Sequence, residues 1–217
     1  MSRRTKIPAL LALALSLPTS ARAQRPEDER PVTFILDLSS GYAAPLGSPD
    51  SGAPDAVKDV LKGLVPVQGE AGVMLDSHWR LLAYGAVGAL VRSNSCHTQT
   101  VVCGGSSAHA GGKVAYSGRG PGGWDLLVGL GAGWQRLNLS ITTDAANTQS
   151  TANGVEGVLE LAALYPIASS FALGPFVGAS LVSSPGWTSI VNGQSSQQSV
   201  SHVYGWLSFG LKLELRL

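Results

Sequence analysis

Apolar and polar residues alternate along much of this chain with a period of two. The last run is the longest, and between Val203 and Leu217 nearly every second residue is apolar. Such alternation is typical of a β-strand with one apolar and one polar face, and a helical period is almost absent. The runs lie at 32–42, 65–75, 79–91, 108–117, 124–135, 155–165, 171–181 and 203–217. The pattern therefore predicts eight strands.

The lengths of the runs and of their connections predict where these strands lie. The runs reach roughly 10–15 residues, whereas strands in globular proteins average about 5–6 and strands tilted across a bilayer need about 9–11. Short connections at 76–78, 118–123 and 166–170 alternate with long ones at 43–64, 93–106, 141–154 and 184–200. Outer-membrane barrels combine short periplasmic turns with longer outer loops. We expect an all-β fold: an eight-stranded antiparallel transmembrane β-barrel, an up-and-down meander that closes 32–42 on 201–217, with both termini in the periplasm.

Two details of this barrel have alternatives. Residues 56–62 carry apolar side chains at helical spacing and form either a short rim helix or an irregular loop, because so short a helix is marginal alone. The run at 79–91 alternates more weakly, so a slip of one residue would reverse its facing. Aromatic residues near the strand ends fit the girdles of a membrane barrel; they are Tyr42, Trp79, Trp124, Tyr165 and Phe171.

The N-terminus has the three parts of a secretory signal. Arg3, Arg4 and Lys6 precede an apolar run at 7–17, and the small-residue site Ala21-Arg22-Ala23 follows. This order is typical of a signal peptide, and the run is too short to cross a bilayer as a helix. We expect residues 1–23 to be a cleaved signal peptide, 24–31 a periplasmic N-terminal lead and 32–217 the barrel. A buried N-terminal helix is the alternative.

Composition excludes several classes of protein. Only 13% of the 217 residues are charged and 44% are hydrophobic, which does not fit a disordered chain. The formal net charge of +1 provides no basic field for nucleic acid. After residue 23 no apolar stretch reaches 18 residues, so we expect no transmembrane helix.

The two cysteines, Cys96 and Cys103, lie close together in a polar stretch rich in Ser and Gly. In an exported chain such a pair favours a disulfide, which would order the second outer loop. A metal site is the alternative, because His97 and His109 are near, but no spacing among these residues fits a tetrahedral ligand set. We therefore expect a Cys96–Cys103 disulfide and no metal or cofactor.

The positions that face the interior carry charges of both signs. They are Asp37, Glu70, Arg80, Arg92, Lys113, Glu156, Glu160, Lys212, Glu214 and Arg216. Side chains fill the interior of an eight-stranded barrel, and an unpaired buried charge is very costly. We expect a lumen charge network made of Asp37, Glu70, Lys113, Glu156, Glu160, Lys212, Glu214 and Arg216 that leaves no continuous channel. Inward glycines leave small water pockets as an alternative.

Motifs for catalysis are missing from the sequence. There is no G-x-S-x-G nucleophile elbow and no H-E-x-x-H zinc motif. His109 lies beside Ser107, and His202 lies beside Ser199 and Ser201, but no acid is placed by the sequence to orient either histidine. We expect no catalytic residues and no enzymatic activity.

The final run also carries a resemblance. Residues 203–217 resemble the C-terminal assembly signal of bacterial outer-membrane proteins, although that signal usually ends in an aromatic residue and this chain ends in Leu217. Residues 38–47 resemble the first strand and loop entry of such barrels. Over 32–217 the chain is similar to the small families of the OmpA barrel domain, OmpX and OmpW. The resemblance implies insertion by the barrel assembly machinery, and outer-membrane lipid and lipopolysaccharide as surroundings.

These observations favour a non-enzymatic integral outer-membrane protein whose surface loops serve interaction or envelope integrity. A narrow channel for small or hydrophobic molecules is the alternative, which the likeness to the OmpW family allows. A lipid A-modifying hydrolase ranks third, because some eight-stranded barrels use a Ser-His pair in that reaction. No nucleic-acid partner is expected, and the sequence does not identify a surface ligand.

Overall fold

The structure is a computed structural model, and it describes residues 32–46, 61–76, 78–92, 101–144, 146–198 and 202–217. Nearly all of this part of the chain is β-strand. The helix it contains is a three-residue 3-10 turn, Pro121–Gly123. Within these ranges no helix is long and apolar enough to cross a membrane.

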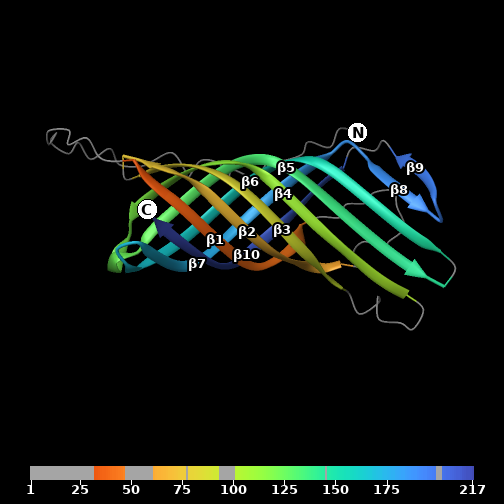
Figure 1. Cartoon of the computed structure of the whole chain (residues 1–217), viewed down its shortest axis with the longest axis horizontal. Coiled ribbons are helices and arrows are strands. Elements are labelled where there is room, and N and C mark those ends of the chain that lie inside the picture. Colours follow the sequence, from red (N-terminus) through yellow and green to blue (C-terminus); the bar gives the residue numbers. More distant parts are fainter. Residues whose placement is uncertain (1–31, 47–60, 77, 93–100, 145, 199–201) are drawn as a thin grey trace, which may run out of the picture. The chain divides into compact units, whose positions relative to one another are not determined.

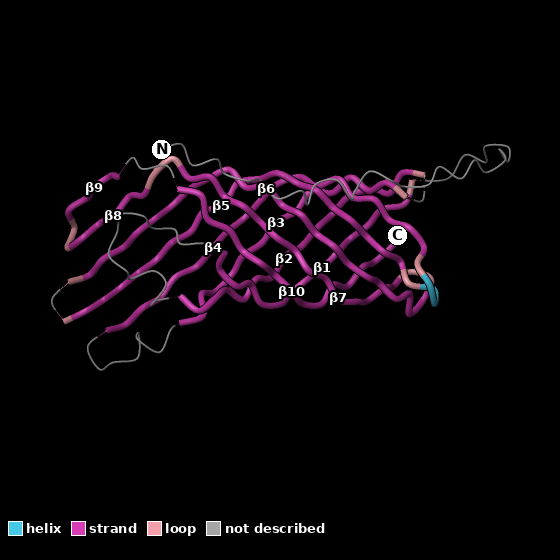
Figure 2. The backbone as a smooth tube through the Cα atoms, turned by 180° about the vertical axis from the view of Figure 1, so that it is seen from behind, coloured by secondary structure: helices cyan, strands magenta, loops and turns pink. Residues whose placement is uncertain are grey.

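Eight strands form a closed ring, seen from two sides in Figures 1 and 2. They are β1 (Thr33–Leu46), β2 (Leu61–Leu75), β3 (Trp79–Arg92), β4 (Val101–Arg119), β5 (Asp125–Thr143), β6 (Asn147–Ala168), β7 (Phe171–Ser184) and β10 (His202–Arg216). Each strand pairs antiparallel with its neighbours, and β10 closes the ring on β1, where Leu213 lies opposite Leu38. Main-chain hydrogen bonds between Phe34 and Leu217 extend this closing ladder. The predicted eight-stranded antiparallel meander, closed from first run to last, is confirmed.

Two further strands form a hairpin that the sequence analysis missed. They are β8 (Trp187–Val191) and β9 (Gln194–Gln198), inside the connection predicted at 184–200. β8 pairs with β6, where Ser189 lies opposite Ser150. Asn192 and Gly193 form the turn with φ of 49° and 85°, the left-handed region that these two residue types tolerate. β9 is entirely polar, and the apolar residues of β8 do not alternate with its polar ones, so alternation could not reveal this hairpin.

The other long connections are shorter than predicted, because the strands continue into them. β5 reaches Thr143 and β6 begins at Asn147, so most of the loop predicted at 141–154 is strand. β4 begins at 101 within the predicted loop 93–106, and β1 and β2 take both ends of 43–64. Of the rim helix considered at 56–62, residues 61–62 belong to β2 and the rest lies outside the described residues. The first part of β6 carries no alternation, because ladder hydrogen bonds need no apolar side chains. The end of β5 does alternate, through Leu137, Leu139 and Ile141, and the sequence analysis missed this signal.

The three short connections lie at one end of the barrel, which we call the turn end, together with Val32 and Leu217. They are the turn at Asp76–His78, the segment with the 3-10 turn, and the turn between β6 and β7. The opposite end, where β1 ends and β2 begins, is called the loop end. Gly122 and Gly123 have φ of 70° and 83°, which glycine adopts without steric cost. The three short connections share one end as predicted, but the predicted alternation of lengths is wrong at the loop end between β5 and β6, where Thr143 and Asn147 are separated by only three residues.

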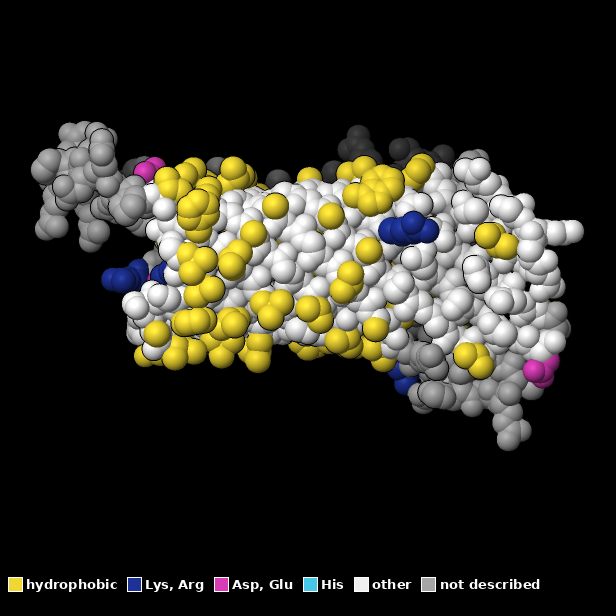
Figure 3. Space-filling model, viewed as in Figure 1, with side chains coloured by type: hydrophobic (Ala, Val, Ile, Leu, Met, Phe, Trp, Pro, Cys, Tyr) yellow, Lys and Arg dark blue, Asp and Glu magenta, His cyan; other side chains and the backbone are white. Residues whose placement is uncertain are grey.

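The outward face of the ring carries a wide apolar band, and the inward face carries the buried charged side chains. In Figure 3 hydrophobic side chains cover the wall toward the turn end and become sparse toward the loop end. The facing predicted for 79–91 is confirmed, because Leu81 is 54% exposed whereas Arg80 is 2% exposed. The apolar outward residues reach from Trp124, just before β5, to Trp134 within it, a distance of ten residue steps. Ten residues at about 3.3 Å each, in a strand tilted by about 40°, span about 25 Å, the height of the apolar band in membrane barrels.

Candidate functional site: the barrel interior

Charged side chains lie inside the barrel because alternate residues of each strand point inward. Eight of them are almost fully buried; they are Asp37, Glu70, Arg80, Lys113, Glu156, Glu160, Lys212 and Glu214. Arg216 is half-buried near the turn end. Arg92 belongs to β3, but its side chain lies outside the described residues. The inward charges fall into three clusters.

The central cluster joins five strands across the lumen. Lys212 Nζ on β10 lies 2.5 Å from Glu160 Oε1, 3.0 Å from Glu70 Oε1 and 3.4 Å from Asp37 Oδ2. Lys113 Nζ on β4 lies 2.7 Å from Glu70 Oε1 and 3.0 Å from Glu160 Oε2. Two cations therefore share three carboxylates from β1, β2 and β6, and the cluster ties opposite walls of the barrel together.

Asp37 is the weakly bound member of this cluster. Neither of its carboxylate oxygens accepts a hydrogen bond from the described residues. Glu70 and Glu214 are its direct neighbours on the two adjacent strands, so acids flank it on both sides. Like charges opposite each other across strands are destabilising. Asp37 therefore adds negative charge to the cluster without a matching set of hydrogen bonds.

A second cluster lies toward the turn end. Arg80 donates to Glu214 in a pair that is buried on both sides. Arg216 bridges two acids: its Nε donates to Glu214 Oε1 at 2.5 Å and its Nη2 to Asp125 Oδ2 at 2.7 Å. The sequence analysis did not assign Asp125 to the interior, although this residue has the same strand parity as the inward Leu127 and Gln135.

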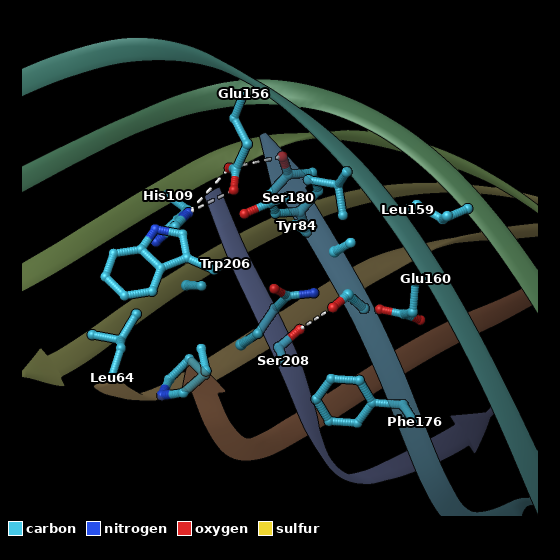
Figure 4. A pocket seen from close by; sticks show the side chains of 17 residues that line it. Leu64, Tyr84, His109, Glu156, Leu159, Glu160, Phe176, Ser180, Trp206 and Ser208 are labelled. Atoms are coloured by element: carbon cyan, nitrogen blue, oxygen red, sulfur yellow. Dashed lines mark hydrogen bonds and ion pairs between the residues drawn. The ribbon is translucent and has the colours of Figure 1, made fainter. Parts of the chain in front are cut away.

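The third cluster, toward the loop end, surrounds His109 (Figure 4). His109 Nδ1 lies 3.0 Å from Glu156 Oε2, and Gln135 Nε2 lies 3.3 Å from His109 Nε2. The Tyr84 hydroxyl donates to Glu156 Oε2 at 3.5 Å. The structure thus supplies an acid for His109 that sequence spacing could not reveal, because β4 and β6 are not adjacent strands.

In a catalytic triad a histidine is paired with an acid on one side and with a nucleophile on the other. Beside His109 the acid is present, but a nucleophile is not in place among the described residues. The ring nitrogen of His109 that would activate a nucleophile lies next to the Gln135 amide. Ser107 Oγ is buried and has no hydrogen-bond partner among the described residues. The side chain of His202, with Ser199 and Ser201, lies outside the described residues. The geometry around His109 therefore fits a structural polar cluster better than a hydrolase site.

A cavity of about 70 Å³ separates the His109 cluster from the central cluster. Its lining mixes polar and aromatic side chains, among them Tyr84, Glu156, Glu160, Phe176 and Trp206 (Figure 4). A cavity of this size, with Glu156, Glu160 and His109 in a largely apolar lining, has room for a few water molecules. No group of three or more His, Cys, Asp or Glu side chains in the described ranges could hold a metal ion.

Apolar clusters fill the interior at both ends. At the loop end Leu64, Leu137, Val182 and other side chains pack around Trp206. At the turn end Leu127, Leu164 and small residues pack together, with Phe176 beside them. The central cluster and the His109 cluster lie between these apolar clusters, whereas Asp125 and Arg216 lie at the turn end beside the second one.

Cys103 lies near the start of β4 and is buried. Cys96 lies outside the described residues. The predicted disulfide between them stays a prediction, as do the boundaries of the signal peptide and the periplasmic lead.

Comparison with known proteins identifies the fold. No protein-family model matches the chain, and no curated protein matches it in sequence. Among solved structures, a major outer membrane protein from Thermus thermophilus is similar with a TM-score of 0.59 and 14% identity, over 87% of this chain and 100% of that chain. Neisserial surface protein A is similar with a TM-score of 0.58 and 9% identity, over 85% of this chain and 97% of that chain. At these identities the likeness shows the fold, which is that of a small bacterial outer-membrane β-barrel.

Proposed function

We propose that this chain, a small outer-membrane β-barrel by its fold, is a non-enzymatic integral protein of the outer membrane. The closed barrel acts as a scaffold, and the loop end provides the surface for interaction or envelope integrity. The observation that carries this proposal is the set of buried ion pairs that cross the barrel interior. The proposal also includes outer-membrane lipid and lipopolysaccharide as surroundings and the barrel assembly machinery as the partner during insertion.

The ion pairs and apolar clusters inside the barrel favour a scaffold function over a pore function. Ions would have to pass Lys113 and Lys212, which together contact three carboxylates, and then the buried pair of Arg80 and Glu214. Removing one partner of a buried pair costs about 3–5 kcal/mol, so these contacts rarely open spontaneously. Apolar side chains add a further barrier at each end.

The long strands at the loop end support a role for that surface. β4 and β5 have 19 residues each and β6 has 22, about twice what a tilted strand needs to cross a bilayer. Their extensions, together with β8 and β9, form a sheet beyond the apolar band that is rich in Ser, Thr, Asn and Gln and also exposes Val102, Ile190 and Val191. Uncharged polar side chains on a fixed sheet suit hydrogen-bonded contact with another molecule at the cell surface.

The proposed orientation places the turn end and both termini in the periplasm, as in other barrels of this type. Protease treatment of intact cells tests it with the full-length protein. We expect cleavage within the loop-end connections and protection of the turns near Asp76, Pro121 and Ser170. Cleavage at those turns in intact cells, with periplasmic proteins uncut, would reverse the orientation.

The narrow channel remains the second candidate, and the cavity beside Glu156 and Glu160 is the observation that favours it. Planar-bilayer recording separates the two functions. The purified full-length protein should show no steady conductance, and neither should Trp206→Ala, which opens the loop-end apolar cluster but leaves the ionic clusters intact. Steady single-channel steps from the wild-type protein would establish the channel instead.

The third candidate function, a lipid A-modifying hydrolase, is tested by a separate experiment. Overexpression in cells should leave the number of acyl chains on lipid A unchanged, as measured by mass spectrometry of extracted lipid. Loss of an acyl chain that depends on His109 would contradict the proposed absence of catalysis.

A further inference from the structure

The outer wall of β5 changes from apolar to polar between two outward residues, Trp134 and Arg136. The Trp134 side chain is 51% exposed, and Val155 lies opposite it on β6. One step further toward the loop end, Arg136 is exposed and lies opposite Asn153. Trp and Tyr side chains mark the membrane interface in barrels. Arg136 therefore lies at the level where lipid headgroups begin.

Neighbouring polar groups hold the Arg136 side chain in place. Arg136 Nε donates to Asn138 Oδ1 at 3.2 Å. The hydroxyl of Thr151 on β6 donates to the same oxygen at 3.1 Å. The two terminal guanidinium nitrogens have no partner among the described residues. A guanidinium fixed through Nε presents its terminal N–H groups outward, and this fork matches the oxygens of a phosphate group.

The charge of Arg136 is isolated on this side of the barrel. β6 contains no Lys or Arg, the other cations of β4 and β5 are the inward Lys113 and the turn-end Arg119, and both acids of β6 point inward. The outward acid nearest along β5 is Asp144, eight residues further toward the loop end. No described acid therefore neutralises Arg136 where it meets the headgroups.

The wall below Arg136 suits an acyl chain. Trp134 has Ala110 as its neighbour on β4 and Val155 on β6. Ala132 is the next outward residue of β5, and Gly112 lies opposite it on β4. The tryptophan ring thus borders a short strip of small residues, which leads from Ala110 past Ala132 and Gly112 toward the turn end and meets the exposed Leu130 there. A lipid with a phosphate at Arg136 can lay a chain along this strip.

We propose that Arg136, positioned by Asn138 and Thr151, binds the phosphate group of a phosphorylated lipid of the outer leaflet. The inference rests on the proposed function, because it requires the loop end of the barrel to lie at the outer surface of the outer membrane. It adds a defined lipid contact to a surface that the proposed function describes only in general terms.

The test uses the purified full-length protein in detergent, with bound lipid counted by native mass spectrometry. The probes are bis-phosphorylated lipid A, the same lipid with its phosphates removed, and inorganic phosphate. We expect one bis-phosphorylated lipid A to be retained, and Arg136→Gln to weaken this binding about tenfold. Arg136→Lys should weaken it less, because a lysine keeps the charge but loses the fork. Arg119→Gln, the matched loss of an exposed arginine at the turn end, should bind as the wild type does.

Three outcomes would overturn the inference: equal binding by wild type and Arg136→Gln, equal binding of the dephosphorylated lipid, or displacement of the lipid by millimolar inorganic phosphate. The third outcome would identify free phosphate as the ligand. Fractionation of cell membranes, performed on the same variants, distinguishes this failure from failure of the proposed function. Protein found in the outer membrane without lipid retention contradicts the lipid site alone. Protein absent from the outer membrane contradicts the proposed function.

Discussion

Replacing Lys212 with methionine removes the cation that contacts one carboxylate from each of three strands inside the barrel. The side chain is fully buried, and its Nζ lies within 3.4 Å of carboxylates from β1, β2 and β6. Methionine keeps most of the volume, so the change tests charge more than packing. Breaking a buried ion pair costs about 3–5 kcal/mol. Lys113 still contacts two of the three acids, so we expect the lower part of this range, about 3 kcal/mol.

The assay is urea unfolding of the barrel reinserted in lipid vesicles, followed by the fluorescence of its tryptophans. A loss of about 3 kcal/mol lowers the equilibrium constant for folding roughly 150-fold. Arg119→Met is the matched control, because it removes an exposed cation at the turn end, and such surface changes usually stay within about 0.5 kcal/mol. Adding Glu160→Gln to Lys212→Met should recover part of the loss, since it removes one of the unpaired acids. A loss for Lys212→Met below about 1 kcal/mol, or equal to that of the control, would refute the central cluster as a source of stability.

Three further predictions test other parts of the interior and the loop end. Asp37→Asn should leave the free energy of unfolding unchanged or raise it, because the carboxylate has acidic neighbours on both adjacent strands. A loss near 3 kcal/mol, measured by urea unfolding, would show instead that its contact with Lys212 dominates. Gly133→Ala should cost about 1–3 kcal/mol, because the new methyl group meets the Tyr84 hydroxyl, whereas Gly157→Ala meets nothing within 4 Å; equal unfolding midpoints would contradict this. If Cys96 and Cys103 form the predicted disulfide, reduction should leave the heat-resistant gel mobility of the barrel unchanged and increase proteolysis of its loop; unfolding on reduction would contradict a rigid barrel with an adaptable loop.

The sequence analysis predicted the ring of eight strands because apolar and polar residues must alternate along each strand that crosses the apolar band. It underestimated the strands beyond this band. Thr148 lies in strand although no apolar residues alternate around it, because cross-strand hydrogen bonds and the β-preference of threonine are sufficient there. On β5 the alternation of Leu137, Leu139 and Ile141 with polar residues was a usable signal that the sequence analysis missed. The β8–β9 hairpin had a usable signal in Asn192-Gly193, the favoured pair for a two-residue hairpin turn.

Strand parity alone determined that Lys113, Glu156 and Glu160 face the interior, because successive side chains of a strand point to opposite faces. Their partners were decided only by the tertiary structure. Glu156 and Glu160 lie four residues apart on one strand, yet the first contacts His109 and the second contacts two lysines. The tilt of the strands and the stagger accumulated around the closed ring decide which side chains meet across the lumen. These are properties of all eight ladders together, and no single strand encodes them.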